Sequence, residues 1–190
     1  MGRGASSVLP TSIHNNKLYF LFGKENKYEK SAPGFSDFGG GIDNNDSFFN
    51  TAVREAGEEI TGFLGNEKEI RILLKKHGTY NIDYNMDHDK TYRVHIFPYE
   101  YDEKLPFYYN NNQKFLQKHL DPSVIKSTKI FEKAEIRWVC VDDIMKMRPQ
   151  FRHFYRNIVD MIHEQKHEIL NFIKKTHSKT TKKKTLKKRH

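Results

Sequence analysis

The sequence has little of what marks secreted or membrane proteins. Cys140 is its only cysteine, which excludes a disulfide within the chain and is typical of a reducing compartment. Its apolar runs, such as residues 18–22, are far shorter than the ~20 residues of a membrane-spanning helix. The first ten residues lack the apolar core of a secretion signal. We therefore expect a cytoplasmic protein, not secreted and without a membrane partner, in which Cys140 is a buried, inert thiol.

Acidic residues are missing from the end of the chain. Residues 174–190 hold nine of the 33 Lys and Arg residues and no Asp or Glu, so the rest of the chain is formally neutral and the net charge of +9 belongs to this tail. Such a composition predicts a disordered basic tail. The tail is suited to contact RNA phosphates without sequence preference, and equally to serve nuclear import or solubility.

Strand and helix patterns alternate along the 190 residues, a length that suits one domain. Strands are predicted at about 6–13, 17–22, 35–38, 78–85, 91–101 and 135–144, and helices at about 47–60, before Gly78, at 107–120 and after Asp142. The apolar stripe from Phe151 to Phe172 predicts one long C-terminal helix. We therefore expect a mixed α/β (α+β) domain over residues 1–173, with a mixed sheet between helices and an insertion at about 103–128.

A glycine-rich loop, Gly39–Gly41, directly precedes a helix that is crowded with carboxylates. On that helix Glu55 lies on the same side as Glu58 and Glu59, and like charges at this spacing repel each other. A divalent cation would offset the repulsion, because Mg²⁺ takes oxygen ligands and also binds substrate phosphate. A carboxylate cluster alone is more often a solvated helix face, so a metal site requires a wider pattern.

The wider pattern resembles the Nudix box, G-x5-E-x7-R-E-U-x-E-E-x-G-U, in which U is apolar. The matching residues are Gly40, Arg54, Glu55, Ala56, Glu58 and Glu59. Asp46 stands where the first Glu is expected. Thr61 replaces the last Gly and Gly62 follows one residue late, so we expect the helix exit to be one residue longer. Together with the flanking strand patterns, the resemblance covers roughly residues 4–165.

The resemblance implies a Nudix-type α/β/α sandwich that uses Mg²⁺ or Mn²⁺ to hydrolyse a nucleoside diphosphate linked to another group, X, by attack of water on phosphorus. The implied metal ligands are Glu55, Glu58, Glu59 and the carbonyl of Gly39 or Gly40. Arg54 would orient one of these carboxylates. Nudix enzymes often use a further Glu outside the box as a base or ligand; Glu132 and Glu135 are the candidates, and we favour Glu135.

Group X is recognised outside the box, where the evidence is thinner. Candidate substrate contacts are Lys24 with phosphate, the backbone of Gly40 and Gly41, and Tyr108 stacked on a base. A solvated loop explains Lys24 equally well, and core packing is the commoner role of an aromatic residue, above all of Trp138 on a predicted central strand.

A finer resemblance, in general character only, is to Nudix proteins of large DNA viruses, some of which are similar to mRNA-decapping enzymes. It favours the cap pyrophosphate of mRNA as substrate. The alternatives are a small nucleoside diphosphate derivative, a dinucleoside polyphosphate or a diphosphoinositol polyphosphate. A non-catalytic RNA-binding protein of this fold is a further alternative, although such a protein has no need of three repelling carboxylates.

Overall fold

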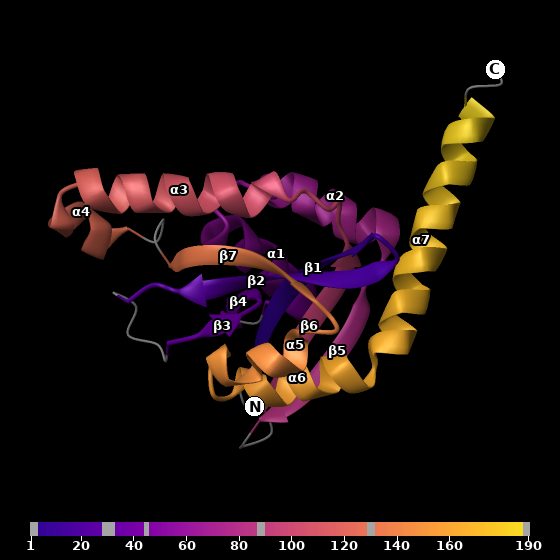
Figure 1. Cartoon of the computed structure of the whole chain (residues 1–190), viewed down its shortest axis with the longest axis horizontal. Helices are drawn as coiled ribbons and strands as arrows, with labels where there is room; N and C mark the ends of the chain where they lie inside the picture. The colour runs from indigo at the N-terminus through magenta and orange to yellow at the C-terminus, as the bar shows by residue number, and fades with distance from the viewer. Residues whose placement is uncertain (1–3, 28–32, 44–45, 87–89, 129–131, 188–190) are drawn as a thin grey trace.

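The computed structural model describes residues 4–27, 33–43, 46–86, 90–128 and 132–187, with side chains described as far as Thr176 (Figure 1). The strands are β1 (Ala5–His14), β2 (Lys17–Glu25), β3 (Phe35–Ser36), β4 (Phe38–Gly41), β5 (Tyr80–Met86), β6 (Lys90–Pro98) and β7 (Lys133–Cys140). The helices are α1 (Phe48–Glu59), α2 (Glu67–His77), α3 (Lys104–His119), α4 (Pro122–Ser127), α5 (Ile144–Met147), α6 (Tyr155–Glu164) and α7 (Lys166–Lys187), with a 3-10 turn, η2 (Arg148–Gln150), after α5.

The sheet is mixed, as the sequence predicted. Strand β1 lies at its centre, parallel to β6 and antiparallel to β2 and β4. Strand β5 pairs with the far side of β6, while β3 and β7 pair with β2. The antiparallel pairing of β1 with β4 sets Ser7 opposite Gly39, which brings the three glycines of β4 to the first half of β1.

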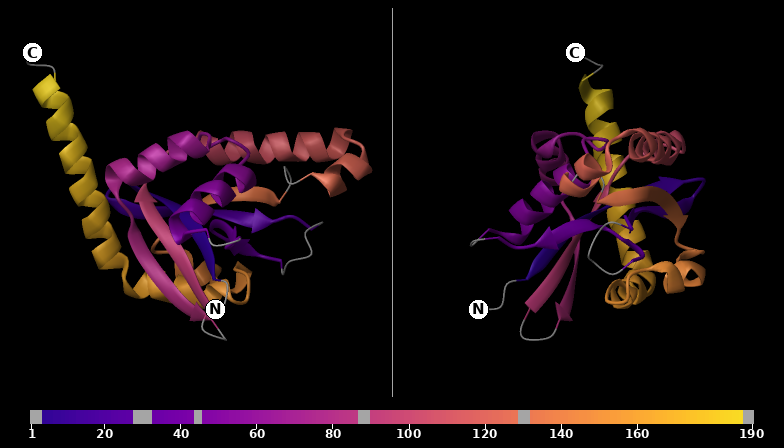
Figure 2. Two further views of the ribbon diagram at one scale, coloured as in Figure 1. Left: turned by 180° about the vertical axis from the view of Figure 1, so that it is seen from behind. Right: turned by 90° about the vertical axis from the view of Figure 1, so that its left-hand side faces the viewer.

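Helices cover both faces of the sheet, which confirms the expected α/β/α sandwich (Figure 2). Neighbouring residues of a strand point to opposite faces. Val8 packs in one core cluster with residues of α1, α2 and α3, whereas Leu9 packs in the other with residues of α6 and α7. Cys140 is a buried free thiol, also as expected. Within the described part of the chain, no helix is long and apolar enough to cross a membrane.

The exit of α1 differs from the expectation of one extra residue. Ile60 caps the helix directly after Glu59, and Thr61 itself takes a left-handed φ of 49°, followed by Gly62 at 82°. Ile60 and Leu64, which precede and follow this turn, are both buried, so the turn is held against the core at both ends. Thr61 therefore adopts a conformation that normally favours glycine.

Replacing Thr61 by glycine should raise the free energy of unfolding by roughly 0.5–1 kcal/mol, because the left-handed strain of a β-branched residue exceeds the entropic cost of glycine. Urea denaturation measures this change. Thr128→Gly is the matched control, since Thr128 has an ordinary φ of −108° and glycine there should reduce stability. Equal losses in both variants would refute strain at Thr61.

The segment predicted as an insertion, at about 103–128, contains two helices where one was predicted. Helix α3 ends at His119, and a second helix begins because the side chain of Asp121 accepts a hydrogen bond from the Ser123 N–H, 2.7 Å away, with Pro122 at the first helical position. An Asp cap followed by proline is a strong helix start. The two helices are therefore separate rather than one continuous segment.

The C-terminal region also differs from one long helix beginning near Phe151. Phe151 instead forms an isolated bridge with Phe35, and the Arg152 N–H donates to the Phe35 carbonyl at 3.0 Å, so helix α6 starts only at Tyr155. A break at Gln165 separates α6 from α7. From residue 174, where a disordered tail was predicted, the structure continues α7 to Lys187 (Figure 1). Lysine is a good helix former, and α7 extends from turns anchored by the buried Ile169 and Ile173.

Candidate active site

Residues Gly39–Gly41, predicted as a loop, instead form strand β4 with Phe38, because they pair with β1, and they meet the carboxylates of α1 there. The Gly39 N–H donates a hydrogen bond to Glu59 Oε2 at 2.8 Å. A Cβ atom at Gly40 would lie 2.6 Å from the carboxylate of Glu55, so only glycine permits this approach. Helix α1 is fixed beside these glycines because the Ser47 side chain caps its first turn and Ala52, Val53 and Ala56 are buried.

Arg54 connects the end of β4 with two of the carboxylates. Its Nη1 lies 2.8 Å from Glu55 Oε1 and 3.5 Å from Glu58 Oε1. Its Nη2 lies 3.3 Å from Asp43 Oδ2 and donates to the Gly41 carbonyl at 3.4 Å. The guanidinium thus holds Glu55 and Glu58 together on one side of α1, the arrangement that the orienting role requires.

Among the described residues, no three His, Cys, Asp or Glu side chains converge as ready-made ligands of one metal ion. Mg²⁺ does not require such a cage, because it keeps several waters and is usually held by one or two carboxylates plus substrate phosphate. Glu55 and Glu58 provide this hard-oxygen set, with side chains 12% and 31% exposed. The carboxylate oxygens of Glu55 and Glu58 beside Arg54 are therefore ligands that suit Mg²⁺ or Mn²⁺.

Glu59 belongs to a buried charge cluster that sequence patterns did not predict. The fully buried Lys133 Nζ binds Glu25 Oε1 and lies 3.1 Å from Glu59 Oε1. Burial raises the pKa of the Glu59 carboxyl to about 8, and the Lys133 ammonium acts against that rise. Glu25 also accepts a hydrogen bond from Arg152 at 3.0 Å. The cluster therefore ties the end of α1 to β2 and β7.

A pocket of about 490 Å³ opens beside this cluster. It is lined by Lys24, Glu25, Asn26, Lys27, Asn110, Lys114, Gln117, Ala134 and Glu135, from the end of β2, one side of α3 and the start of β7. Glu25 belongs both to the pocket and to the buried cluster, which connects the pocket to the box through Lys133 and Glu59. Three lysines at its wall favour an anionic occupant.

The two glutamates outside the box occupy different environments. Glu135 lines the pocket and accepts a hydrogen bond from Arg137 Nη2 at 2.6 Å. Glu132 directly precedes Lys133 of the buried cluster, and its carbonyl accepts a hydrogen bond from the Asn26 N–H at 2.9 Å. Glu135 thus belongs to the pocket, whereas Glu132 stands in the chain beside the buried cluster.

Two predicted aromatic positions lie away from the carboxylates. Tyr108 is 57% exposed on α3 and does not line the pocket. Trp138 was expected in the core of a central strand, but among the strands that the structure describes β7 pairs with β2 alone and is an edge strand. Trp138 is therefore only partly buried, with its ring 5.2 Å from that of Tyr101 and its Nε1 donating to the Asp102 carbonyl at 3.0 Å.

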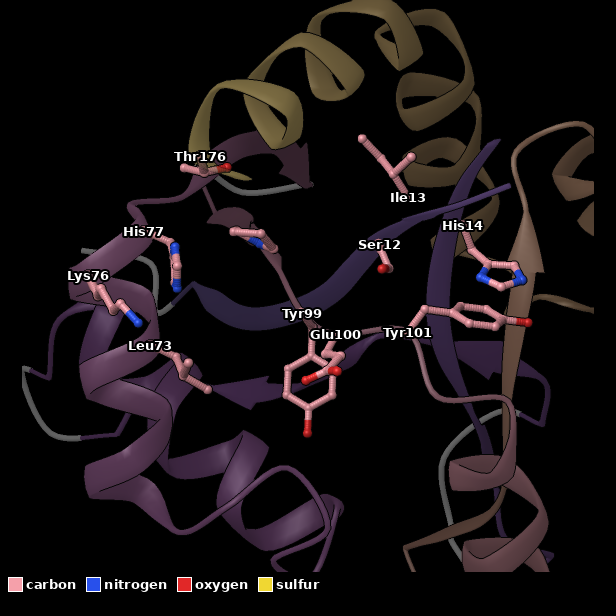
Figure 3. A pocket seen from close by; sticks show the side chains of 11 residues that line it. Ser12, Ile13, His14, Leu73, Lys76, His77, Tyr99, Glu100, Tyr101 and Thr176 are labelled. Atoms are coloured by element: carbon pink, nitrogen blue, oxygen red, sulfur yellow. The ribbon is translucent and has the colours of Figure 1, made fainter. Parts of the chain in front are cut away.

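A larger cavity, of about 680 Å³, lies at the other end of β1 (Figure 3). It is lined by Ser12, Ile13, His14, Leu73, Lys76, His77, Pro98, Tyr99, Glu100, Tyr101 and Thr176. The His14 ring stacks on Tyr101 with centroids 4.1 Å apart. None of the predicted site residues reaches this cavity, so the candidate active site remains at the box and the smaller pocket.

Solved structures identify the fold. The chain matches the Nudix hydrolase RenU from M. smegmatis with a TM-score of 0.53 and 15% identity, over 88% of each chain. A second match is MutT from a study of Aliivibrio salmonicida and Vibrio cholerae, with a TM-score of 0.49 and 11% identity, over 86% of this chain and 98% of that one. A third is the Ap4A hydrolase of C. elegans, with a TM-score of 0.46 and 12% identity, over 84% of this chain and 93% of that one.

No protein-family model matches the sequence, and no curated protein matches it. At these identities the structural likeness establishes the fold alone. The chain has the fold of a Nudix hydrolase, and its Nudix-like sequence pattern runs from strand β4 into helix α1.

Proposed function

We propose that this protein is a metal-dependent pyrophosphohydrolase that cleaves a nucleoside diphosphate–X bond, with Mg²⁺ or Mn²⁺ as cofactor. The observation that supports this most is the placement of Arg54, Glu55 and Glu58 beside the glycines of β4, within a Nudix fold. A bound ion would polarise phosphorus and lower the pKa of an attacking water. We infer that Glu55 and Glu58 hold that ion, with help from the Gly40 carbonyl and, once released from Lys133, from Glu59.

The other residues bind the substrate and move the proton. Lys24, Lys27 and Lys114 face the pocket and would neutralise the phosphates of the substrate. The backbone of Gly40 and Gly41 lets phosphate approach closely, since neither carries a side chain. The attacking water would lose its proton to a carboxylate outside the box, either Glu132, beside Lys133 in the chain, or Glu135 at the pocket.

For the substrate, we propose the cap pyrophosphate of mRNA. The lysine-lined pocket next to the box, on the side of α3, supports a polyanionic substrate that extends beyond one pyrophosphate. Small nucleoside diphosphate derivatives, dinucleoside polyphosphates and diphosphoinositol polyphosphates fit the same chemistry and are the alternative substrates.

A substrate panel tests this proposal. The full chain is incubated with capped RNA, a dinucleoside polyphosphate, ADP-ribose and a diphosphoinositol polyphosphate, with Mg²⁺, with Mn²⁺ and with EDTA. Release of a capped nucleotide that stops in EDTA supports decapping, whereas cleavage of a small substrate alone assigns the enzyme to that substrate. Binding of RNA without turnover of any substrate would make the protein a non-catalytic binder and refute the proposal.

We further propose that the basic segment 174–190 contributes to RNA binding. A chain that ends at Thr176 keeps the buried Ile173 and removes seven Lys and Arg residues. Its affinity for RNA should fall, and the dependence of that affinity on salt should weaken, because fewer counterions are released. Fluorescence anisotropy across a salt series measures both, and hydrolysis of small substrates should be unchanged. An unaltered salt dependence would show that the segment makes no phosphate contacts.

A further inference from the structure

The outer face of α3 presents three large aromatic side chains. Phe107, Tyr108 and Phe115 are 62%, 57% and 61% exposed. The Phe107 and Tyr108 rings meet edge to face with centroids 5.4 Å apart, and the Phe115 ring lies 4.6 Å from that of His119. Tyr108 and Phe115 are seven residues apart and so lie two turns apart on the same side of the helix. Exposed aromatic residues grouped in this way mark a binding surface rather than scattered surface residues.

The charge within α3 is of one sign, while Asp102 and Glu103 directly precede the helix. Helix α3 contains Lys104, Lys114 and Lys118 and no Asp or Glu. All three lysines are exposed. An apolar protein or lipid partner would not require lysines between the aromatic residues. Aromatic rings that stack bases, interleaved with cations that contact phosphates, are instead the pattern of proteins that bind single-stranded nucleic acid.

The same helix forms one wall of the pocket at the active site. Asn110, Lys114 and Gln117 line the pocket. Phe107 precedes Lys114 by seven residues, so the two side chains lie two turns apart on the same side of the helix. The exposed face therefore continues around α3 from the pocket to Tyr108 and Phe115. A strand bound along this face would lead directly to the lysines of the pocket.

Helix α3 is held firmly in this position. The Tyr109 hydroxyl donates to the Lys133 carbonyl at 3.1 Å and lies 3.3 Å from the carbonyl of Glu59, the last residue of α1. The Asn110 side chain pairs with the backbone of Ile136, accepting from its N–H at 2.8 Å and donating to its carbonyl at 3.1 Å. The aromatic face is thus fixed relative to the box, which a base-stacking platform requires.

We propose that the α3 face, defined by Lys104, Phe107, Tyr108, Phe115 and Lys118, binds a single-stranded RNA segment whose 5′ end enters the lysine-lined pocket. The aromatic rings stack the bases and the lysines contact the phosphates. The RNA as substrate rests on the proposed function, whereas binding of the strand to α3 does not require turnover.

The test measures RNA binding without hydrolysis. The full chain is titrated with a short, labelled, uncapped single-stranded RNA in EDTA, at a salt concentration high enough to weaken contacts with the basic tail. The triple variant Phe107→Ala/Tyr108→Ala/Phe115→Ala should bind at least about 10-fold more weakly, because each lost stack is worth roughly 1–3 kcal/mol. Tyr108→Phe should bind like the wild type. Ile72→Ala, at a 53% exposed apolar residue of α2, is the matched control and should have no effect.

Unchanged RNA affinity in the triple variant would overturn the proposal, as would equal losses in Ile72→Ala. A triple variant that loses affinity only for single-stranded DNA would also overturn it. The removed side chains are exposed, so circular dichroism should show an intact fold. If the wild type binds RNA through α3 but hydrolyses nothing, the proposed function fails and this inference stands. If capped RNA is cleaved with an unchanged KM in the triple variant, the inference fails and the proposed function stands.

Discussion

Glu58→Gln should reduce kcat/KM for the pyrophosphate substrate at least about 100-fold, a loss of roughly 3 kcal/mol of transition-state stabilisation. The amide keeps the shape of the side chain but removes the negative charge that would hold the cation. The Glu58 side chain is 31% exposed, and its Oε1 lies 3.5 Å from Arg54 Nη1, which is a long distance for an ion pair. The free energy of unfolding should therefore change by less than about 0.5 kcal/mol. Initial rates at saturating Mn²⁺ and urea denaturation measure the two effects separately.

The matched control is Glu164→Gln, at an exposed carboxylate of α6 on the opposite layer of the sandwich. It removes the same charge and should leave the rate unchanged. A Glu58→Gln variant that retains full activity would show that Glu58 plays no part in the reaction. An equal loss in both variants would point to net charge rather than to the site.

Lys133→Met should lower the free energy of unfolding by about 3–5 kcal/mol, because it leaves Glu25 and Glu59 buried without their common cation. The Lys133 side chain is fully buried, so water cannot replace it. Since the ammonium opposes the burial that raises the pKa of Glu59, its loss should raise that pKa further. Guanidinium denaturation at pH 7 measures the change in stability.

The double variant Lys133→Met/Glu59→Gln separates charge from packing. Arg152 still pairs with Glu25 at 3.0 Å, so the second change removes the carboxylate that has lost its cation and should regain at least about 1 kcal/mol relative to the single variant. Lys146→Met is the surface control, because Lys146 forms a 2.8 Å ion pair with Asp143 while remaining 79% exposed, and its loss should leave stability nearly unchanged. A Lys133→Met variant as stable as Lys146→Met would contradict the role of the buried cluster.

The elements of the box were predictable because their determinants are local. Ser47 precedes an apolar repeat that ends near Ile60, and this spacing predicts a capped amphipathic helix. The glycines before it and the fixed distance to Arg54 and Glu55 placed the loop against the carboxylates. The structure confirms the helix and its approach to the glycines, but it places Gly39–Gly41 in strand β4 rather than in a loop, and the catalytic roles remain predictions.

The buried cluster was not predictable because it depends on pairing between distant segments. Glu25 and Lys133 become neighbours only when β2 and β7 pair antiparallel, with an irregularity in register at Lys24 and Glu25. In the sequence each lies in a polar stretch that is typical of solvent-exposed loops. Periodicity failed in the same way at Phe151, whose backbone joins the sheet through Phe35 although its side chain fits a helical stripe.

The most direct measurement is hydrolysis in ¹⁸O-labelled water by the wild type and by Glu58→Gln, with a capped RNA and a dinucleoside polyphosphate as substrates. With Mg²⁺ or Mn²⁺, the wild type should place one ¹⁸O atom on a phosphate product of at least one substrate, and Glu58→Gln should lose that activity. Absence of turnover for both substrates and all other members of the panel, or turnover that persists undiminished in Glu58→Gln, would contradict a pyrophosphohydrolase centred on the carboxylates of α1.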